Sequence, residues 1–199
     1  MANCFDVISK SVLQNCTAQE AAGFTGRAVI LQWIDNPTIT VSATNSNMIT
    51  SIELPALKKG IEVDNANFID PFSGSNYTAN TDDGSRKILK SFTFKVPLRG
   101  SEVSRKLLEG MFFDNFGGSG AIVVAEKIVN GVGKYSVIGY KSPFLINPDG
   151  LKQDEYADGA AFILTGSCKE RAIEVELFDT DIAKTKTAFE DLLDNCYNV

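Results

Sequence analysis

The chain has 199 residues, of which 44% are hydrophobic and 22% are charged, a balance typical of a folded globular protein rather than a disordered one. Its formal net charge of −6, with a pI near 4.8, is opposite to the balance usual in nucleic-acid-binding domains. The absence of histidine excludes serine–histidine and cysteine–histidine nucleophile pairs and zinc sites that need imidazole.

The first 25 residues mix polar and small side chains, and we interpret them as an arm before the core. They contain no continuous apolar stretch like that of a signal peptide, and no window of the chain approaches the length of a membrane span. We therefore expect synthesis in a reducing cytoplasm, with Cys4, Cys16, Cys168 and Cys196 as free thiols. A zinc site built from all four thiolates is the alternative, although no C-x-x-C pair supports it.

Three strands and a continuation of their sheet are predicted next along the chain. "GRAVILQWI" at residues 26–34 is rich in β-branched and aromatic residues and is followed by the turn-forming "DNP". "TITVSA" at residues 38–43 and "MITSIEL" at residues 48–54 continue a meander. We expect "GIEVDNANFID" at residues 60–70 to extend the same sheet.

Residues 71–85, "PFSGSNYTANTDDGS", lose all periodicity and are filled with Ser, Asn, Thr, Asp and Gly. The pattern predicts a long loop, and a structureless run of this length in a compact domain is either functional or disordered. We interpret the loop at residues 70–85 as a contact element that becomes ordered with a partner. A mobile solvent loop without a role is the alternative.

A strand and a helix follow the loop. In "RKILKSFTFKVPLRG" at residues 86–100, Phe92, Phe94, Val96 and Leu98 alternate with polar residues, which predicts a strand with one buried face. Residues 101–114 change to helical spacing, and Ser101 is placed to cap the start. One amphipathic helix between strands fits a plug against an open end or face of a barrel.

The last third of the chain alternates strands with glycine-bearing turns. "IVVAEKIV", "NGVG" and "KYSVIGY" at residues 122–140 predict a hairpin. "SPFLINPDG" at residues 142–150 predicts a short strand that ends in a turn, and "GAAFILTGSC" and "RAIEVELF" predict a final pair joined by "KE". Residues 181–199 predict a helix with Ala188, Phe189, Leu192, Leu193 and Cys196 on one side.

These elements predict a mainly β fold with one internal helix and a C-terminal helix. We expect an arm at residues 1–25 and a single β domain at residues 26–180. The domain contains the loop at residues 70–85 and the helix at residues 101–114, and residues 181–199 form the terminal helix.

No group of residues indicates catalysis or a cofactor. Several carboxylates lie in predicted turns and loops: Asp70, Asp82, Asp83, Asp149, Asp154, Glu155 and Asp158. Their order in the sequence matches neither a calcium-binding loop nor the carboxylate pair of a glycosidase. "FGGSG" at residues 116–120 opens a strand rather than a helix, so a tight connection is favoured over a phosphate site. Trp33 is more typical of a core residue than of a stacking site.

The basic residues do not form a nucleic-acid footprint either. Those near the loop are too thinly scattered for one: Lys58, Lys59, Arg86, Lys87 and Lys90. We therefore expect no enzyme activity, no cofactor, no metal, no sequence-specific binding of nucleic acid and no binding to a membrane.

The opening "MANCFDVISKSVLQNC" followed by "AAGFTGRAVILQW" resembles the start of virion structural proteins of tailed phages of gut bacteria, crAss-like phages among them. The stretch from "GAIVVAEKIVNGVGKYSVIGY" to "AFILTGSCKERAIEVEL", with its "F-x-L-x-G", is similar to their strand order. The resemblance covers roughly residues 1–180 and consists mostly of the order and spacing of strands. The final helix at residues 183–195 departs from it.

This resemblance implies a tail-tube-like β-barrel or sandwich that forms a ring or tube segment of the virion tail, without enzymatic activity. It implies a homo-oligomer, with a sixfold or twelvefold ring plausible, next to other tail or portal-proximal virion proteins. The subunit would be made in the bacterial host cytoplasm, and DNA would pass through a channel whose acidic wall repels it. The loop residues that fit an inter-subunit contact are Asp70, Phe72, Asn76, Tyr77, Asp82 and Asp83.

Two other functions remain open on the sequence. A β-sandwich that binds a carbohydrate or a receptor is the main alternative, and aromatic residues clustered on an exposed face would favour it. A hydrolase that uses carboxylates alone would need two acids with separated pKa values in one cleft, and the sequence contains no spacing signal for them.

Overall fold

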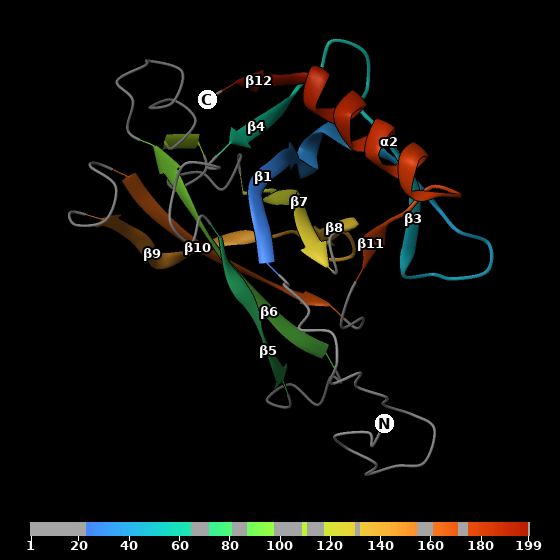
Figure 1. Ribbon diagram of the computed structural model, residues 1–199. Helices are drawn as coiled ribbons and strands as arrows, with labels where there is room; N and C mark the ends of the chain where they lie inside the picture. The colour runs from blue at the N-terminus through green and yellow to red at the C-terminus, as the bar shows by residue number, and fades with distance from the viewer. Residues whose placement is uncertain are drawn as a thin grey trace, which may run out of the picture.

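The structure of the protein is a computed structural model, and it describes residues 23–64, 72–80, 87–97, 109–110, 118–129, 132–154, 161–170 and 175–198. In this part, the chain is mainly β, with two sheets and one long helix, α2 (Figure 1). The prediction of a mainly β fold is therefore confirmed. Neither sheet closes on itself among the described residues, since each ends in two edge strands.

The larger sheet has eight strands and is mostly antiparallel, with parallel pairs β12–β4 and β11–β3. Its strands, from one edge to the other, are β12 (Cys196–Asn198), β4 (Gly60–Asp64), β1 (Gly23–Gln32), β7 (Ala121–Val129), β8 (Val132–Ile138), β11 (Glu176–Leu177), β3 (Met48–Glu53) and β2 (Thr38–Val41). A single 3₁₀ turn, η1 (Trp33–Asp35), follows β1.

The smaller sheet is antiparallel and has longer strands. Its order is β5 (Phe72–Asn80), β6 (Lys87–Pro97), β10 (Ala161–Glu170) and β9 (Leu145–Asp154). The central β6 and β10 pair over ten consecutive residues, from Ala161 opposite Pro97 to Glu170 opposite Ile88.

Helix α2 (Ile182–Asp194) covers one side of the eight-stranded sheet, and the four-stranded sheet lies on the other side (Figure 1). Buried Phe189, Leu192 and Leu193 of α2 share a core with Val29 of β1 and Val137 of β8. Consecutive residues of the two central strands are buried, and these point alternately to the two faces of the sheet: Ala28 to Leu31 in β1 and Ala121 to Ala125 in β7. Both central strands are therefore covered on both faces, as the runs "AVIL" and "AIVVA" require.

The connection from β8 to β9 joins the two sheets tightly. Phe144 pairs with Ala121 through two backbone hydrogen bonds of 2.9 Å, and its ring lies where a side chain at position 166 would otherwise be. Gly139 has a φ of +88°, and a Cβ there would collide with the Ala121 carbonyl. Glycine is needed here because the backbone is left-handed and passes so close to β7.

The predicted loop at residues 70–85 is wrong in its middle, because Phe72–Asn80 forms strand β5, paired with β6. Its polar, glycine-containing sequence has low strand propensity, but β-propensity depends strongly on context, and here the partner strand determines the structure. The rest of that range lies outside the described residues.

Three further expectations differ from the structure. Strand β9 does not end in a turn at Pro148–Gly150 but continues to Asp154 as an edge strand, where proline is tolerated. The "KE" at residues 169–170 is not a turn but the end of β10, and β10 and β11 belong to different sheets. The C-terminal helix ends at Asp194, and the residues after it form β12.

Other predicted elements agree with the structure. Seven strands start within three residues of their predicted starts: β1, β2, β3, β4, β6, β7 and β8. The hairpin of β7 and β8 is confirmed. Of the predicted helix at residues 101–114, Glu109 and Gly110 are helical and the rest lies outside the described residues.

Candidate functional site

The residues predicted to make inter-subunit contacts fall on an edge strand. Phe72, Asn76 and Tyr77 belong to β5, which has β6 as its one neighbour in the described part of the sheet. Asp70, Asp82 and Asp83 lie outside the described residues. The structure thus brings three of the six to the outer edge of the four-stranded sheet.

Strand β5 differs from the other three edge strands of the described chain. Its nine residues contain no charged residue and no proline, whereas β9 contains Pro148, Asp149, Lys152 and Asp154. The edges β2 and β12 are short, with four and three residues. Proteins usually protect edges with charge, proline, shortness or a bulge, and β5 has one of these devices, a shift in register between Ser73 and Asn76. From Asn76 to Asn80 the strand is regular.

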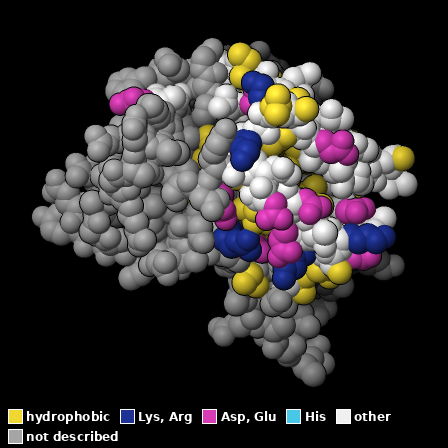
Figure 2. Space-filling view, turned by 90° about the horizontal axis from the view of Figure 1, so that it is seen from above, with side chains coloured by type: hydrophobic (Ala, Val, Ile, Leu, Met, Phe, Trp, Pro, Cys, Tyr) yellow, Lys and Arg dark blue, Asp and Glu magenta, His cyan; other side chains and the backbone are white. Residues whose placement is uncertain are grey.

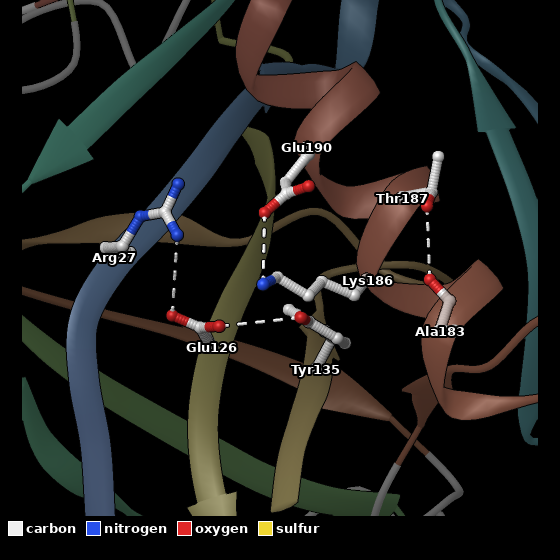
Figure 3. A network of polar contacts seen from close by, with 7 residues as sticks. All are labelled: Arg27, Glu126, Tyr135, Ala183, Lys186, Thr187 and Glu190. Atoms are coloured by element: carbon white, nitrogen blue, oxygen red, sulfur yellow. Dashed lines mark hydrogen bonds and ion pairs between the residues drawn. The ribbon is translucent and has the colours of Figure 1, made fainter.

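A second group of residues forms a polar row under α2 (Figure 3). Glu126 of β7 lies between Arg27 of β1, whose guanidinium is 4.0 Å from its carboxylate, and Tyr135 of β8, whose hydroxyl donates to it over 3.4 Å. The Tyr135 ring packs 4.5 Å from the Phe189 ring of α2, and the Arg27 guanidinium lies 5.8 Å from the same ring. The row ties three strands to the helix.

The Tyr135 hydroxyl is not suited to act as a base. Burial raises its pKa to about 12, and the adjacent Glu126 carboxylate adds to the shift because it disfavours a second negative charge. Tyr135 is therefore neutral at physiological pH. We infer that the row has a structural role, since a protonated tyrosine between a carboxylate and an aromatic ring supports packing rather than nucleophilic chemistry.

A small apolar pocket lies beside this row, at the end of α2 where the helix begins. Its volume is about 250 Å³. The apolar part of its lining comes from three strands and the helix: Met48, Val132, Tyr135, Leu177, Phe178 and Ile182. A mainly apolar concave site with a few polar groups is the usual form of a binding site.

The polar rim of the pocket contains charged residues from neighbouring strands. Glu176 lies 3.6 Å from the Lys134 ammonium and 3.7 Å from that of Lys127. Burial lowers the pKa of Lys127, although Glu176 opposes that effect. Of these three residues, Lys134 and Glu176 line the pocket itself, and Lys127 contacts Glu176 from behind the rim.

A buried ion pair in the four-stranded sheet was not expected from the sequence. The Lys90 ammonium contacts the Glu170 carboxylate at 2.6 Å, and the two side chains are 3% and 0% exposed. The second Glu170 oxygen accepts a hydrogen bond of 3.1 Å from the Lys141 backbone N–H, so the carboxylate has two partners. Lys90, one of the basic residues too scattered in the sequence for a nucleic-acid footprint, is thus buried in the sheet rather than exposed.

Both described cysteines are buried and free. Burial raises the pKa of Cys168 and of Cys196 to about 12, and the Glu170 carboxylate adds to the effect at Cys168. Such thiols are inert at neutral pH. Cys4 and Cys16 lie outside the described residues, and the described residues contain no cluster of histidine, cysteine or carboxylates that could hold a metal ion.

Two other sequence interpretations are confirmed. Trp33 is partly buried against the core, as expected of a packing residue. Gly118 and Gly120 have φ values of +78° and +75° and form a tight connection into β7 rather than a helix start.

The described part of one face carries acidic and basic side chains that are interspersed (Figure 2). No helix in the described ranges has the length and apolar character to cross a membrane. None of the protein-family models, curated proteins or solved structures compared with the chain matches it.

Proposed function

We propose that the protein is a structural subunit that assembles with copies of itself into a ring or tube segment of a phage virion tail. In this proposal the two sheets form a tail-tube-like sandwich or barrel wall, and DNA passes through the channel that the ring encloses. The subunit is made in the host cytoplasm and later contacts neighbouring tail or portal-proximal proteins. It has no enzymatic role.

The single observation that supports self-assembly is the edge strand β5. In the described part of the sheet, β5 is a long, uncharged, proline-free edge strand, and the outward backbone N–H and C=O groups of such an edge are a template for pairing with another chain. When the partner is another copy of the same chain and the contact joins two different surfaces, repetition closes into a ring or continues as a tube. The phage context of the proposal depends on the sequence resemblance.

The charge of the chain is compatible with a DNA conduit. A net charge of −6 repels a polyanion at long range, so DNA would pass without adhering. The carbohydrate-binding alternative has no comparable support among the described residues, because the large hydrophobic side chains exposed there are all aliphatic: Ile34, Leu57, Ile128, Leu145 and Ile182.

The experiment that tests the proposal is the mass of the untagged protein in solution, measured by light scattering, with negative-stain images of any large species. We expect closed rings or short tubes, formed more readily at higher protein concentration. A protein that stays monomeric at every concentration tested would contradict self-assembly.

Two proline variants test whether β5 is the contact. Successive N–H groups of a strand point to opposite sides, so Thr78→Pro and Ala79→Pro remove one group that faces β6 and one that faces the open edge. We expect one variant to keep the native melting temperature and lose the ring, and the other to be destabilised. If the stably folded variant still forms rings, β5 is not the contact strand.

A further inference from the structure

Helix α2 does not cover the whole face of the sheet on which it packs. Val29, Val124 and Val137 lie in the core beneath it, and the polar row of Arg27, Glu126 and Tyr135 follows along the strands. The strands then continue for one more row on that face.

This last row consists of Gly23, Ile128 and Gly133, which are opposite one another across β1, β7 and β8. Ile128 is 41% exposed. Gly133 lines the apolar pocket described above, and on the helix side of that pocket Ile182 is 54% exposed. We call this surface, formed by Ile128, Gly133 and Ile182, the end patch.

The end patch lacks a cover among the described residues. Removing exposed apolar surface from water is favourable, so two half-exposed isoleucines beside an apolar pocket are a place where another apolar segment would bind. Gly23 also adds no side chain of its own to the row.

The chain itself provides such a segment beside the patch. Residues 1–22 precede Gly23, and two inter-strand spacings, about 10 Å, separate Gly23 from Gly133. Three or four extended residues span that distance. The segment contains five large apolar residues within nine positions: Phe5, Val7, Ile8, Val12 and Leu13.

We propose that residues 1–22 dock on the end patch through these apolar side chains. The covalent link gives the segment an effective concentration of about millimolar at the patch, so even a small apolar contact is populated. The segment binds either to its own chain or to the patch of a neighbouring copy. This docking does not depend on the phage function proposed above.

Native cysteines make the proposal directly testable. Cys4 and Cys16 flank the five apolar residues, whereas Cys168 and Cys196 are buried and do not compete. In the full-length Ile182→Cys variant, mild oxidation should form a disulfide between position 182 and Cys4 or Cys16, identified by peptide mapping. The matched control is Ile34→Cys: Ile34 is 61% exposed and lies in η1, which the Lys58–Asp35 ion pair ties to the β3–β4 loop beside the C-terminal half of α2.

We expect the Ile182→Cys disulfide to form about tenfold faster than any Ile34→Cys disulfide to the same cysteines. A link within one chain shows docking on the segment's own subunit, and a covalent dimer shows exchange between copies. Val132→Cys, on the opposite wall of the pocket, repeats the test if Ile182→Cys does not fold. Equal rates at positions 182 and 34, or no disulfide at either position 182 or position 132, would overturn the proposal.

Discussion

The ion pair of Lys90 and Glu170 is the most deeply buried of the ion pairs between described residues. Each oxygen of the Glu170 carboxylate accepts a hydrogen bond, one from the Lys90 ammonium and the other from the Lys141 N–H. Such a pair adds little net stability, but losing one partner is costly because the other charge stays buried. The pair therefore constrains which substitutions the four-stranded sheet tolerates.

We predict that Lys90→Met lowers the free energy of unfolding by about 3–5 kcal/mol, because Glu170 remains in the core without its cation. The double variant with Lys90→Met and Glu170→Gln should recover much of that loss, since the neutral amide still accepts the Lys141 N–H. Urea unfolding of the single and double variants measures both values. A single variant as stable as the double one would contradict this account.

Tyr135 should make stability depend on alkaline pH. Its pKa is about 12 in the folded protein and about 10 when unfolded, so the stability that this raised pKa contributes is fully present below about pH 10. It is lost as the pH rises from about 10 to about 12. We predict that Tyr135→Phe weakens this alkaline fall in the unfolding free energy.

Urea unfolding in reducing buffer between about pH 9 and about pH 11.5 tests the Tyr135 prediction. The buried thiols of Cys168 and Cys196 are present in both proteins, so the difference between the curves isolates Tyr135. Tyr140→Phe, at a partly buried tyrosine beside the same core, is the matched control. Parallel curves for the wild type and Tyr135→Phe would show that the Tyr135 proton is not linked to folding.

Part of the residue-level chemistry was present in the sequence. Lys90 precedes Phe92 by two residues, so the alternation that predicts a buried face for Phe92 also directs Lys90 inward. Glu170 likewise follows Cys168 by two. The sequence could therefore indicate two inward charges, but their pairing depends on the β6–β10 register, which strand patterns alone do not determine.

At the scale of elements, α2 is held by one aromatic residue more than by its own capping. The Asp181 carboxylate accepts the Lys184 N–H over 2.8 Å at the N-terminus, and buried Thr185 hydrogen-bonds to the same turn. Phe189, with no exposed surface, contacts Tyr135 and Arg27 at once. It connects the helix to the polar row of the sheet.

We predict that Phe189→Ala lowers the free energy of unfolding by about 3–5 kcal/mol, through lost burial and the cavity that remains. Lys184→Ala, on the exposed side of the same helix, should change it by less than about 0.5 kcal/mol. Denaturant titrations followed by circular dichroism compare the two. A small effect of Phe189→Ala would mean that the helix is not anchored through this ring.

The elements with strong patterns were predictable and those with weak patterns were not. The sequence of the β7–β8 hairpin has β-branched residues in both strands and an Asn-Gly pair between them, and the helix at residues 182–194 has regular apolar spacing. Strand β5 has neither, because a long partner strand rather than its own sequence makes it a strand. Strand β12 is three residues long, too short for any period to appear.

At the scale of the whole molecule, sheet membership was beyond the sequence. The chain passes between the two sheets at β4–β5, β6–β7, β8–β9 and β10–β11. Strands next to each other in sequence therefore often belong to different sheets, as the mistaken pairing of β10 with β11 shows. Such crossings make neither sheet a contiguous part of the chain, so we expect the sheets to unfold as one cooperative unit.

The two buried cysteines test this cooperativity, because Cys168 lies in β10 of the smaller sheet and Cys196 in β12 of the larger one. Both thiols should resist alkylation in the native protein at neutral pH. In rising urea, both should become labelled with the same midpoint, measured by peptide mass spectrometry after brief exposure to iodoacetamide. Labelling of Cys168 at clearly lower urea than Cys196 would show that the sheets unfold separately.

The four crossings also determine when the protein can fold during translation. Strand β1 is made well before its partner β7, because two of the four strands of the smaller sheet come between them, and β12 reaches β4 only after α2 has been made. A nascent chain therefore holds unfinished sheets until these later strands have been made, and such non-local pairing makes folding slow. The smaller sheet is also late, because β6 pairs early with β5 but gains β10 only after β7, β8 and β9 have been made. The edge that we propose for assembly therefore belongs to a four-stranded sheet only from that point on.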